Sequence, residues 1–170
     1  DEPVELGFDS PLDLYCNYSR DQLLTALDYY TMDKMPSMRE GVLYLKDKDI
    51  DVLLVTLNKA EKDYSPTTLY NDYSINEFLF HWQSQSTTSD TSSTGQRYIH
   101  HKQQGSKVLL FVREYKTGKA GSANLALPYT FLGLADYVSH EGSRPMNIVW
   151  RLRKPIPAKY LKKTNKLVVG

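Results

Sequence analysis

Cysteine is almost absent from this 170-residue chain, which has only Cys16. A single cysteine cannot form an intramolecular disulfide or a paired-cysteine zinc site, so zinc deaminase chemistry is excluded. No apolar run approaches the roughly 18 residues that a membrane-spanning helix requires. We also find no Gly-x-x-x-x-Gly-Lys-Ser/Thr phosphate loop, no phospholipase D-type nuclease motif and no Gly-x-Ser-x-Gly elbow. We therefore expect a chain without catalytic residues, metal or cofactor of its own.

Acidic residues are missing from the segment 144–170, which contains eight lysines and arginines. Residues 1–51, in contrast, contain twelve acids and five bases. A segregated basic end suits a surface that contacts phosphates, because neutralising phosphates releases counterions. A solubilising tail is the alternative that charge alone leaves open.

Local patterns predict an α+β fold: a strand-rich curved sheet or small barrel with two or more flanking helices. The segment SRDQ at 19–22 fits a capping box, and leucines follow at helical spacing, which predicts a helix near 20–31. The segment SINE at 74–77 fits a second capping box and predicts a helix near 75–85. Short β-prone runs predict strands at 41–45, 51–57, 97–100, 107–115, 129–132 and 147–152.

We expect the whole chain, 1–170, to form a single recognition domain that is a fragment of a larger protein. Residues 1–18 are expected to be an N-terminal arm, and residues 155–170 a basic tail. The segment 86–96 contains eight serines and threonines and is expected to be a flexible loop.

The stretch YNDYSINEFLFHWQSQ at 70–85 is the most informative part of the sequence. It combines tyrosines, a tryptophan, a histidine, an aspartate and side-chain amides, which stack on flat rings and read hydrogen-bonding edges. This composition indicates a recognition module for a nucleic-acid base. We expect the pocket residues to be Tyr70, Asp72, Tyr73, His81, Trp82 and Gln83.

Several motifs together resemble one protein family. They are REGV (39–42), TLNK (56–59), SPTTLYNDYSIN (65–76), LFHWQSQS (79–86), GQRYIHH (95–101), VLLFVRE (108–114), FLG with ADY (131–137) and HEGSRPMNIVWRL (140–152). Over about residues 39–157 the chain resembles the C-terminal domain, catalogued as of unknown function, of SauUSI-like modification-dependent restriction endonucleases. These are large bacterial helicase-like proteins with a phospholipase D-type nuclease domain.

The resemblance implies a non-catalytic target-recognition domain of a type IV restriction enzyme active in phage defence. It would read 5-methylcytosine, and 5-hydroxymethylcytosine, in double-stranded DNA by base flipping, on an SRA-like fold. Its other partners would be the helicase and nuclease domains of the same polypeptide, which would use ATP and a divalent metal. The implied location is the bacterial cytoplasm, with no membrane partner.

A reader of this kind needs flat side chains on either side of the base, an acceptor for the cytosine amino group and an apolar niche for the methyl group. Asp72 is the favoured acceptor, although it could instead cap the 75–85 helix. Tyr70 and Tyr73 could stack on the base or pack in the core. Trp82 lies on the apolar face of the expected helix, where a core position is the alternative.

A second set of side chains is expected to contact the DNA backbone or a groove. For most of them the alternative is an ordinary solvated loop or pairing with acids of the same domain. The set comprises Lys59, Lys62, Ser65, Thr67, Thr68, Ser84, Gln85, Arg97, Lys102, Arg144, Arg151 and Arg153.

Two other interpretations stay open. The adjacent His100 and His101 suggest a metal, but neighbours in a strand point to opposite faces and no third ligand is close in sequence. The rival function is a protein-interaction or non-specific DNA-clamp domain that couples the helicase motor to its partner. Only a reader should prefer methylated DNA at equal salt.

Overall fold

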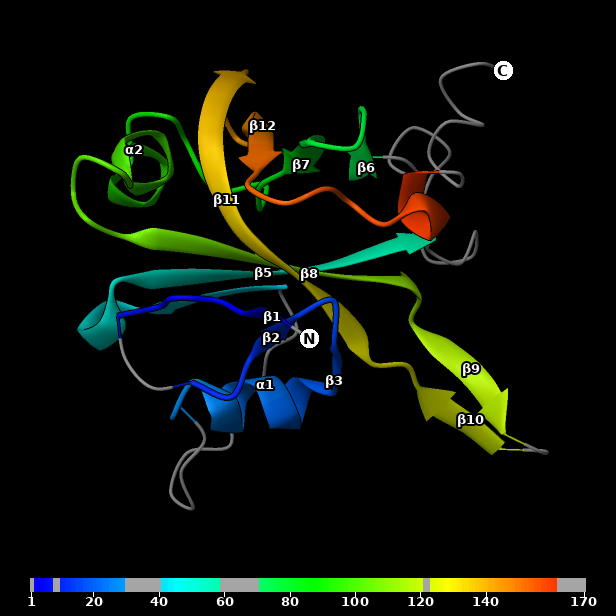
Figure 1. Cartoon of the computed structure of the whole chain (residues 1–170). Coiled ribbons are helices and arrows are strands. Elements are labelled where there is room, and N and C mark those ends of the chain that lie inside the picture. The colour runs from blue at the N-terminus through cyan, green and yellow to red at the C-terminus, as the bar shows by residue number, and fades with distance from the viewer. Residues whose placement is uncertain (1, 8–9, 30–40, 59–70, 121–122, 162–170) are drawn as a thin grey trace.

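The computed structural model describes residues 2–7, 10–29, 41–58, 71–120 and 123–161. Its main sheet has eight strands in the order β4-β5-β8-β11-β12-β7-β6, with β3 paired to β11 (Figure 1). The main-sheet strands are β3 (Asn17–Tyr18), β4 (Val42–Leu45), β5 (Ile50–Asn58), β6 (Tyr73–Ser74), β7 (Leu79–Gln83), β8 (Lys107–Tyr115), β11 (Tyr129–Glu141) and β12 (Asn147–Leu152). The remaining elements are β1 (Glu2–Pro3), β2 (Asp13–Leu14), α1 (Arg20–Ala26), the 3₁₀ turn η1 (Lys46–Lys48), α2 (Ser93–His100), β9 (Thr117–Ala120) and β10 (Ala123–Ala126).

Strands β5 and β8 lie parallel at the centre and are covered on both faces. Their side chains alternate between two hydrophobic clusters, because successive residues of a strand point to opposite faces. Val108 and Leu110 belong to one cluster, whereas Leu109 and Phe111 belong to the other. Double coverage explains why both strands read as almost continuous apolar runs in the sequence.

The long strand β11 bends, so that one end of the sheet lies above the central strands β5 and β8 (Figure 1). Its pairing shifts register between Phe131 and Gly133 and again between Tyr137 and Ser139, and such bulges bend a strand. Gly133 has φ +88°, a conformation that favours glycine. As a result β12 and β7 fold back above β8 (Figure 1), and their inward side chains share a cluster with those of β5 and β8.

The predicted strand-rich α+β class with a curved sheet is confirmed, and the small-barrel alternative is not adopted. Among the described residues the sheet is open, since β4 and β6 are its two ends and do not pair with each other. None of the helices in the described segments is long and apolar enough to cross a membrane.

The predicted helix near 20–31 begins where the capping box placed it. The Ser19 hydroxyl accepts the Gln22 backbone N–H, and the Gln22 side chain accepts the Ser19 N–H. The helix is shorter than predicted, because α1 ends at Ala26, while residues 30–31 lie outside the described residues.

The segment expected to be an N-terminal arm contributes to the core instead. Leu6 and Leu12 are buried in the same cluster as Leu23 and Leu24 of α1. Strand β3 also pairs with the first residues of β11. Where they are described, residues 2–18 therefore cover the second face of β5 and β8.

Most of the predicted strands are present. The strands predicted at 41–45 and 51–57 are observed as β4 and β5, which pair with each other, and 107–115 and 147–152 are the bounds of β8 and β12. The strand predicted at 129–132 extends much further, to Glu141.

The helix predicted near 75–85 is wrong, and β7 occupies this position. Phe80 and Trp82 are buried while His81 and Gln83 are half-buried, which is the alternation of a strand covered on one face. The expected capping box is a turn, in which the Asn76 side chain accepts the backbone N–H groups of residues 78 and 79. Pairing with β12 overrode the helix-like spacing of the apolar residues.

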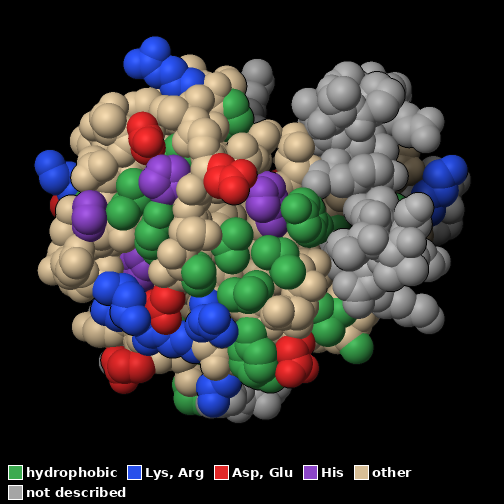
Figure 2. All heavy atoms as spheres, turned by 90° about the horizontal axis from the view of Figure 1, so that it is seen from above, with side chains coloured by type: hydrophobic (Ala, Val, Ile, Leu, Met, Phe, Trp, Pro, Cys, Tyr) green, Lys and Arg blue, Asp and Glu red, His purple; other side chains and the backbone are tan. Residues whose placement is uncertain are grey.

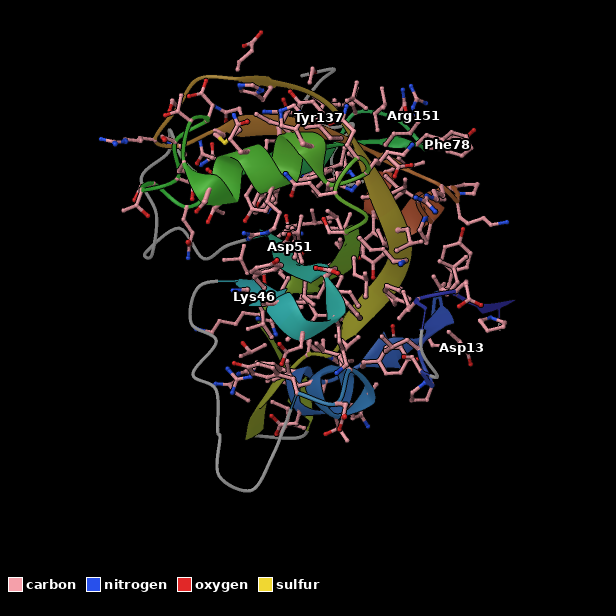
Figure 3. The ribbon with its side chains drawn as sticks, turned by 90° about the vertical axis from the view of Figure 1, so that its left-hand side faces the viewer. Asp13, Lys46, Asp51, Phe78, Tyr137 and Arg151 are labelled. Carbon is pink, nitrogen blue, oxygen red and sulfur yellow. The ribbon has the colours of Figure 1, made fainter. Side chains whose placement is uncertain are left out.

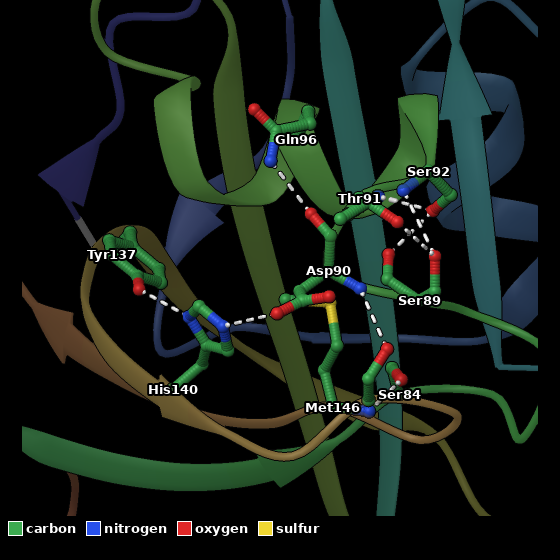
Figure 4. A network of polar contacts seen from close by, with 11 residues as sticks. Ser84, Ser89, Asp90, Thr91, Ser92, Gln96, Tyr137, His140 and Met146 are labelled. Carbon is green, nitrogen blue, oxygen red and sulfur yellow. Dashed lines mark hydrogen bonds and ion pairs between the residues drawn. The ribbon is translucent and has the colours of Figure 1, made fainter.

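The strand predicted at 97–100 is also wrong, because these residues lie in α2. The expected flexible loop at 86–96 is ordered: Thr88 and Ser89 are buried, and the helix begins inside the segment, after the Ser92 N-cap. Asp90 is held from several sides (Figure 4). Its backbone N–H donates to Ser143 Oγ, and its carbonyl accepts the Gln96 amide.

A hydrogen-bonded chain fixes the same segment to β11 (Figure 4). The Tyr137 hydroxyl lies 2.6 Å from His140 Nδ1, and His140 Nε2 lies 3.4 Å from a carboxylate oxygen of Asp90. Burial raises the pKa of Tyr137, so the phenol keeps its proton at neutral pH. A protonated phenol can donate to His140, and the resulting chain of contacts holds the segment around Asp90 against β11.

Candidate functional site

The outer surface of β6, β7 and β12 is a sheet face that no described helix covers, and we refer to it as the open face (Figure 2). Figure 2 shows hydrophobic side chains gathered in the middle of the surface seen from above, with Lys and Arg side chains beside them. Figure 3 places Phe78 and Arg151 along the same top edge. The cross-strand register assigns to the open face Tyr73, Leu79, His81, Gln83, Asn147, Val149 and Arg151.

An aromatic stack lies on the open face. The rings of Tyr73 and His81 face each other directly across β6 and β7, with centroids 4.7 Å apart and planes at 13°. The His81 Nδ1 lies 2.7 Å from the Asn71 carbonyl, which holds the imidazole in place. Both side chains stay half-exposed, so the stack offers flat surface to a planar ligand.

Two side-chain amides lie next to this stack. Gln83 and Asn147 are paired residues of β7 and β12, and Gln83 Nε2 donates to Asn147 Oδ1 at 3.2 Å. This bond leaves Gln83 Oε1 as an acceptor and Asn147 Nδ2 as a donor, neither bonded elsewhere among the residues the structure describes. An acceptor beside a donor matches the pairing edge of cytosine, which has an amino donor next to a ring-nitrogen acceptor.

Asp72 accepts a hydrogen bond from the backbone of β7 next to these amides. Its Oδ1 accepts the backbone N–H of Gln83 at 2.9 Å, so one carboxylate oxygen is already engaged with β7. The structure therefore places Asp72 next to Gln83 at the edge of the open face.

Two predicted site residues lie inside the protein. Trp82 is only 3% exposed and packs against the rings of Tyr98 and Trp150, so it has no face available for a base. Ser84 is buried, and its hydroxyl accepts the backbone N–H of Met146 and donates to the Gln85 carbonyl. Both belong to the framework that positions β7.

Arg97, expected in a DNA groove, forms a buried ion pair. Its Nε and Nη2 donate to the two carboxylate oxygens of Asp51 at 2.8 and 2.9 Å. Its guanidinium also lies 3.5 Å from the centroid of the Tyr44 ring. This geometry joins α2 to β5 and leaves Arg97 engaged in holding the fold.

The other predicted cations that the structure describes, Lys102, Arg144, Arg151 and Arg153, are exposed. Arg153 donates to both oxygens of Asp136, and Lys102 lies 3.8 Å from the same carboxylate. Burial alone would raise the pKa of Asp136, but hydrogen bonding to Arg153 and the nearby positive charges lower it below its ordinary value. Arg151, on the open face, and Arg144, in the turn before β12, are both exposed.

Several predicted site residues cannot be placed. Tyr70 and the polar loop before it lie outside the described residues: Lys59, Lys62, Ser65, Thr67 and Thr68. The basic side chains of 162–170 also lie outside them.

His100 and His101 lie on α2 and at its C-terminal end rather than on a strand. His101 is buried; its Nε2 accepts the Tyr137 backbone N–H, so its Nδ1 carries the proton and faces the Ser106 carbonyl. Burial lowers the pKa of His101, which keeps the ring neutral. No group of three or more metal-ligand side chains converges anywhere in the described part of the chain.

A cavity of about 1130 Å³ lies on the α1 side of the sheet, away from the open face. Asp21, Asp28, Asp47 and Asp49 line it, with Lys48 and Lys107. Four carboxylates against two amines repel an anionic ligand, so this cavity suits a phosphate group poorly.

Asn147 and Val149 were missed at the level of sequence. The alternation in NIVWRL could have identified them, because burying Ile148 and Trp150 turns Asn147, Val149 and Arg151 outward. Their closeness to His81 and Gln83 has no sequence signal, since it depends on the pairing of β12 with β7.

Comparison with known families gives one match. The family model described as Domain of unknown function (DUF3427) matches residues 12–163, which is most of the chain. No curated protein matches the sequence.

Proposed function

We propose that this chain, which belongs to the family described as Domain of unknown function (DUF3427), is a DNA-recognition domain that reads modified cytosine in duplex DNA. The parent protein in this proposal is a SauUSI-like, ATP-dependent restriction endonuclease of bacteria, whose motor and nuclease lie in other domains. The domain itself binds and does not catalyse.

One observation carries the proposal: the three groups that a modified-cytosine reader needs lie side by side on the open face. The Tyr73–His81 stack supplies flat aromatic surface. Gln83 and Asn147 supply an acceptor and a donor for the base edge. Val149, the cross-strand neighbour of His81, supplies an apolar surface for the methyl group.

Recognition of one methyl group requires close contact. Transfer of a methyl from water is worth on the order of 0.8 kcal/mol, so the niche must fit tightly to give strong preference. Flipping the base out of the stack would give the open face access to the methyl group and the pairing edge together. Arg151, on the same face, would contact a backbone phosphate.

The proposal is tested by titrating a labelled duplex, unmodified or with one 5-methylcytosine, at fixed near-physiological salt. A preference of about tenfold, or about 1.4 kcal/mol, is expected for the modified duplex. Gln83→Ala should remove the preference for cytosine-containing targets, because it removes the acceptor. The control Gln104→Ala truncates the same amide at an exposed position after α2 and should change nothing.

Three outcomes contradict this function in different ways. Equal binding of both duplexes would reduce the domain to a general DNA clamp. No binding of either duplex would favour the protein-interaction domain. An unchanged methyl preference in a folded Gln83→Ala protein would move the base-reading site away from the open face.

A further inference from the structure

The open face has two chemically different ends. Asp136 of β11 lies opposite Arg151 of β12, so their side chains share this face of the sheet. Two residues back along β12 is Val149, and four residues back is Asn147, which lies opposite Gln83 of β7. The open face therefore has a charged end at Asp136 and Arg151 and an amide end at Asn147 and Gln83, with Val149 between them.

The charged end is the centre of a cluster of cations. Arg153 donates to both carboxylate oxygens of Asp136, at 3.2 and 3.0 Å, and Lys102 Nζ lies 3.8 Å from the same carboxylate. The Asp136 side chain is only 17% exposed, whereas those of Arg153 and Lys102 are 50% and 63% exposed. Together with Arg151, three cations surround one largely covered acid, which leaves an excess of positive charge at the surface. We refer to Lys102, Arg151 and Arg153 as the cationic cluster.

Each member of the cationic cluster stands on ordered backbone. Arg151 lies in β12, which is paired on one side with β11 and on the other with β7. The Arg153 backbone N–H donates to the Leu134 carbonyl at 3.1 Å, and the Lys102 carbonyl accepts the Gly105 N–H at 3.2 Å. An anion at this position would meet cations from separate segments that are already close together, so little ordering would be lost on binding.

The shape of a nucleotide connects the cationic cluster with the base site. In cytosine the sugar is attached to the ring nitrogen opposite the carbon that carries the amino group. A base that presents its amino group to Gln83 and Asn147 therefore directs its sugar away from the amide end. Arg151 is four residues from Asn147, which is about 13 Å along a strand. The charged end thus lies on the side toward which the sugar and its phosphates extend.

The acid at the amide end agrees with this direction. Glu141 lies opposite Asn147, so it adds a negative charge beside the amides that would repel a backbone phosphate there. At the charged end the acid is instead outnumbered by cations. The two ends therefore differ in the part of a nucleotide that they can accept.

We infer that the cationic cluster binds the phosphates on either side of the modified nucleotide and that Asp136 is its counter-ion in the free protein. This inference rests on the proposed function and adds the orientation of the bound strand, with its base edge at the amide end and its backbone at the charged end. Arginine binds phosphate through two parallel N–H bonds, as Arg153 binds the Asp136 carboxylate. A phosphate that reaches Arg153 therefore competes with Asp136 for the same donors.

The first test removes the competing acid from the full 170-residue chain. Asp136→Asn should bind a duplex with one 5-methylcytosine about fivefold more tightly at fixed near-physiological salt, because no carboxylate then competes with the phosphate or repels it. The control Asp49→Asn makes the same substitution at an exposed position on the α1 side of the sheet. The left-handed backbone of Asp49, with φ +54°, accepts asparagine, so this variant should bind as the unchanged chain does.

A second test locates the phosphates. Single phosphates of the methylated strand are replaced, one at a time, by uncharged methylphosphonates. Binding of the unchanged chain should weaken most for replacements next to the modified nucleotide, and Arg153→Ala should no longer respond to one of them. The control Arg144→Ala removes an exposed arginine from the turn beyond the amide end and should still respond to that replacement.

The inference is wrong if Asp136→Asn gains no more affinity than Asp49→Asn, or if Arg153→Ala and Arg144→Ala respond alike to every replacement, while the unchanged chain still prefers methylated DNA. Equal binding of methylated and unmethylated duplexes by the unchanged chain would overturn the proposed function, and with it the position of the cluster beside a modified base.

Discussion

Strands β5 and β8 are buried on both faces, whereas β7 and β12 are buried on one face only. The first pair holds Val52, Leu53, Leu109 and Leu110, all with no measurable exposure. The second pair alternates buried residues with half-exposed polar and aromatic ones. The comparison shows where this domain can accept a ligand, because only the second pair presents side chains that are ordered by the sheet and still reachable.

The largest expected difference between the two pairs is in stability. Phe111 of β8 is fully buried and stacks on Phe131, so Phe111→Ala should cost about 3–5 kcal/mol of unfolding free energy. Val149→Ala on the open face should cost about 1 kcal/mol or less. Urea unfolding measures both values.

The two variants should behave in the opposite way in DNA binding. Val149→Ala should lower the preference for methylated over unmethylated DNA, since it removes the apolar surface expected to contact the methyl group. Phe111→Ala should leave that preference unchanged under conditions in which the protein is folded. If Val149→Ala keeps the full methyl preference, the open face does not contact the methyl group.

Arginines of the two regions should differ almost as strongly. Arg97→Ala leaves the Asp51 carboxylate buried without its partner and should cost about 3 kcal/mol of stability. Arg151→Ala, at an exposed position, should change stability by less than about 0.5 kcal/mol.

DNA titration gives the reverse order for these arginines. Arg151→Ala should weaken all duplexes about equally and lower the salt slope by roughly one, because it removes a phosphate contact. The slope of a folded Arg97→Ala protein should not change. A smaller slope for Arg97→Ala would mean that this arginine contacts DNA after all.

Acid should weaken the junction between α2 and β11. The pKa of His101 is lowered by burial, so the unfolded chain binds a proton more readily than the folded one. The stability contributed by neutral His101 is complete above its ordinary pKa of about 6.5 and decreases as the pH falls below that value. Protonation would place a second N–H against the Tyr137 N–H, which now donates to His101 Nε2.

Urea unfolding at about pH 7.5 and about pH 5.5 measures this dependence. His101→Gln should be less stable at the higher pH but should vary less between the two. The control His100→Gln removes the neighbouring histidine, which hydrogen-bonds to the Gln103 side chain, and should keep the dependence caused by His101. Identical pH dependence in His101→Gln would assign the titration to another group.

Asp136 and Arg153 form an ion pair at the surface, and its loss should cost less stability than the changes at Phe111 and Arg97. Asp136→Asn removes the charge that faces Arg153 and Lys102 and should cost under about 1 kcal/mol near neutral pH. Since the pKa of Asp136 is lowered, its stabilising effect is complete above the ordinary value of about 3.9 and is lost as the pH falls below it. The stability difference between the two proteins should therefore vanish in acid, which thermal unfolding across this pH range would detect.

Sequence patterns located β5 and β8, which are covered on both faces, and also β12, but they missed β7. The apolar runs that became β5 and β8 can only be satisfied in a buried strand, and both were predicted. In LFHWQ the apolar residues fit a helix as well as a strand, and only pairing with β12 decides between them. The same ambiguity led to the wrong strand at 97–100, where the Ser92 N-cap begins a helix.

The candidate site was predicted in part. Tyr73, His81 and Gln83 share the open face as the composition of 70–85 indicated, although on a strand rather than a helix. Trp82 and Ser84 point inward because neighbouring residues of a strand alternate between faces. Arg97 could not be assigned from sequence, since its partner Asp51 is 46 residues away in the chain.

The sequence by itself determined the α+β class, the central strands and the capped start of α1, because these depend on local periodicity and on side chains close in the chain. Only the tertiary structure decided that β12 pairs with β7, that β11 bends the sheet into an open curl, and that Gln83 meets Asn147. These features arise from contacts between distant residues, whose energy exceeds the weak local preference of a short apolar run.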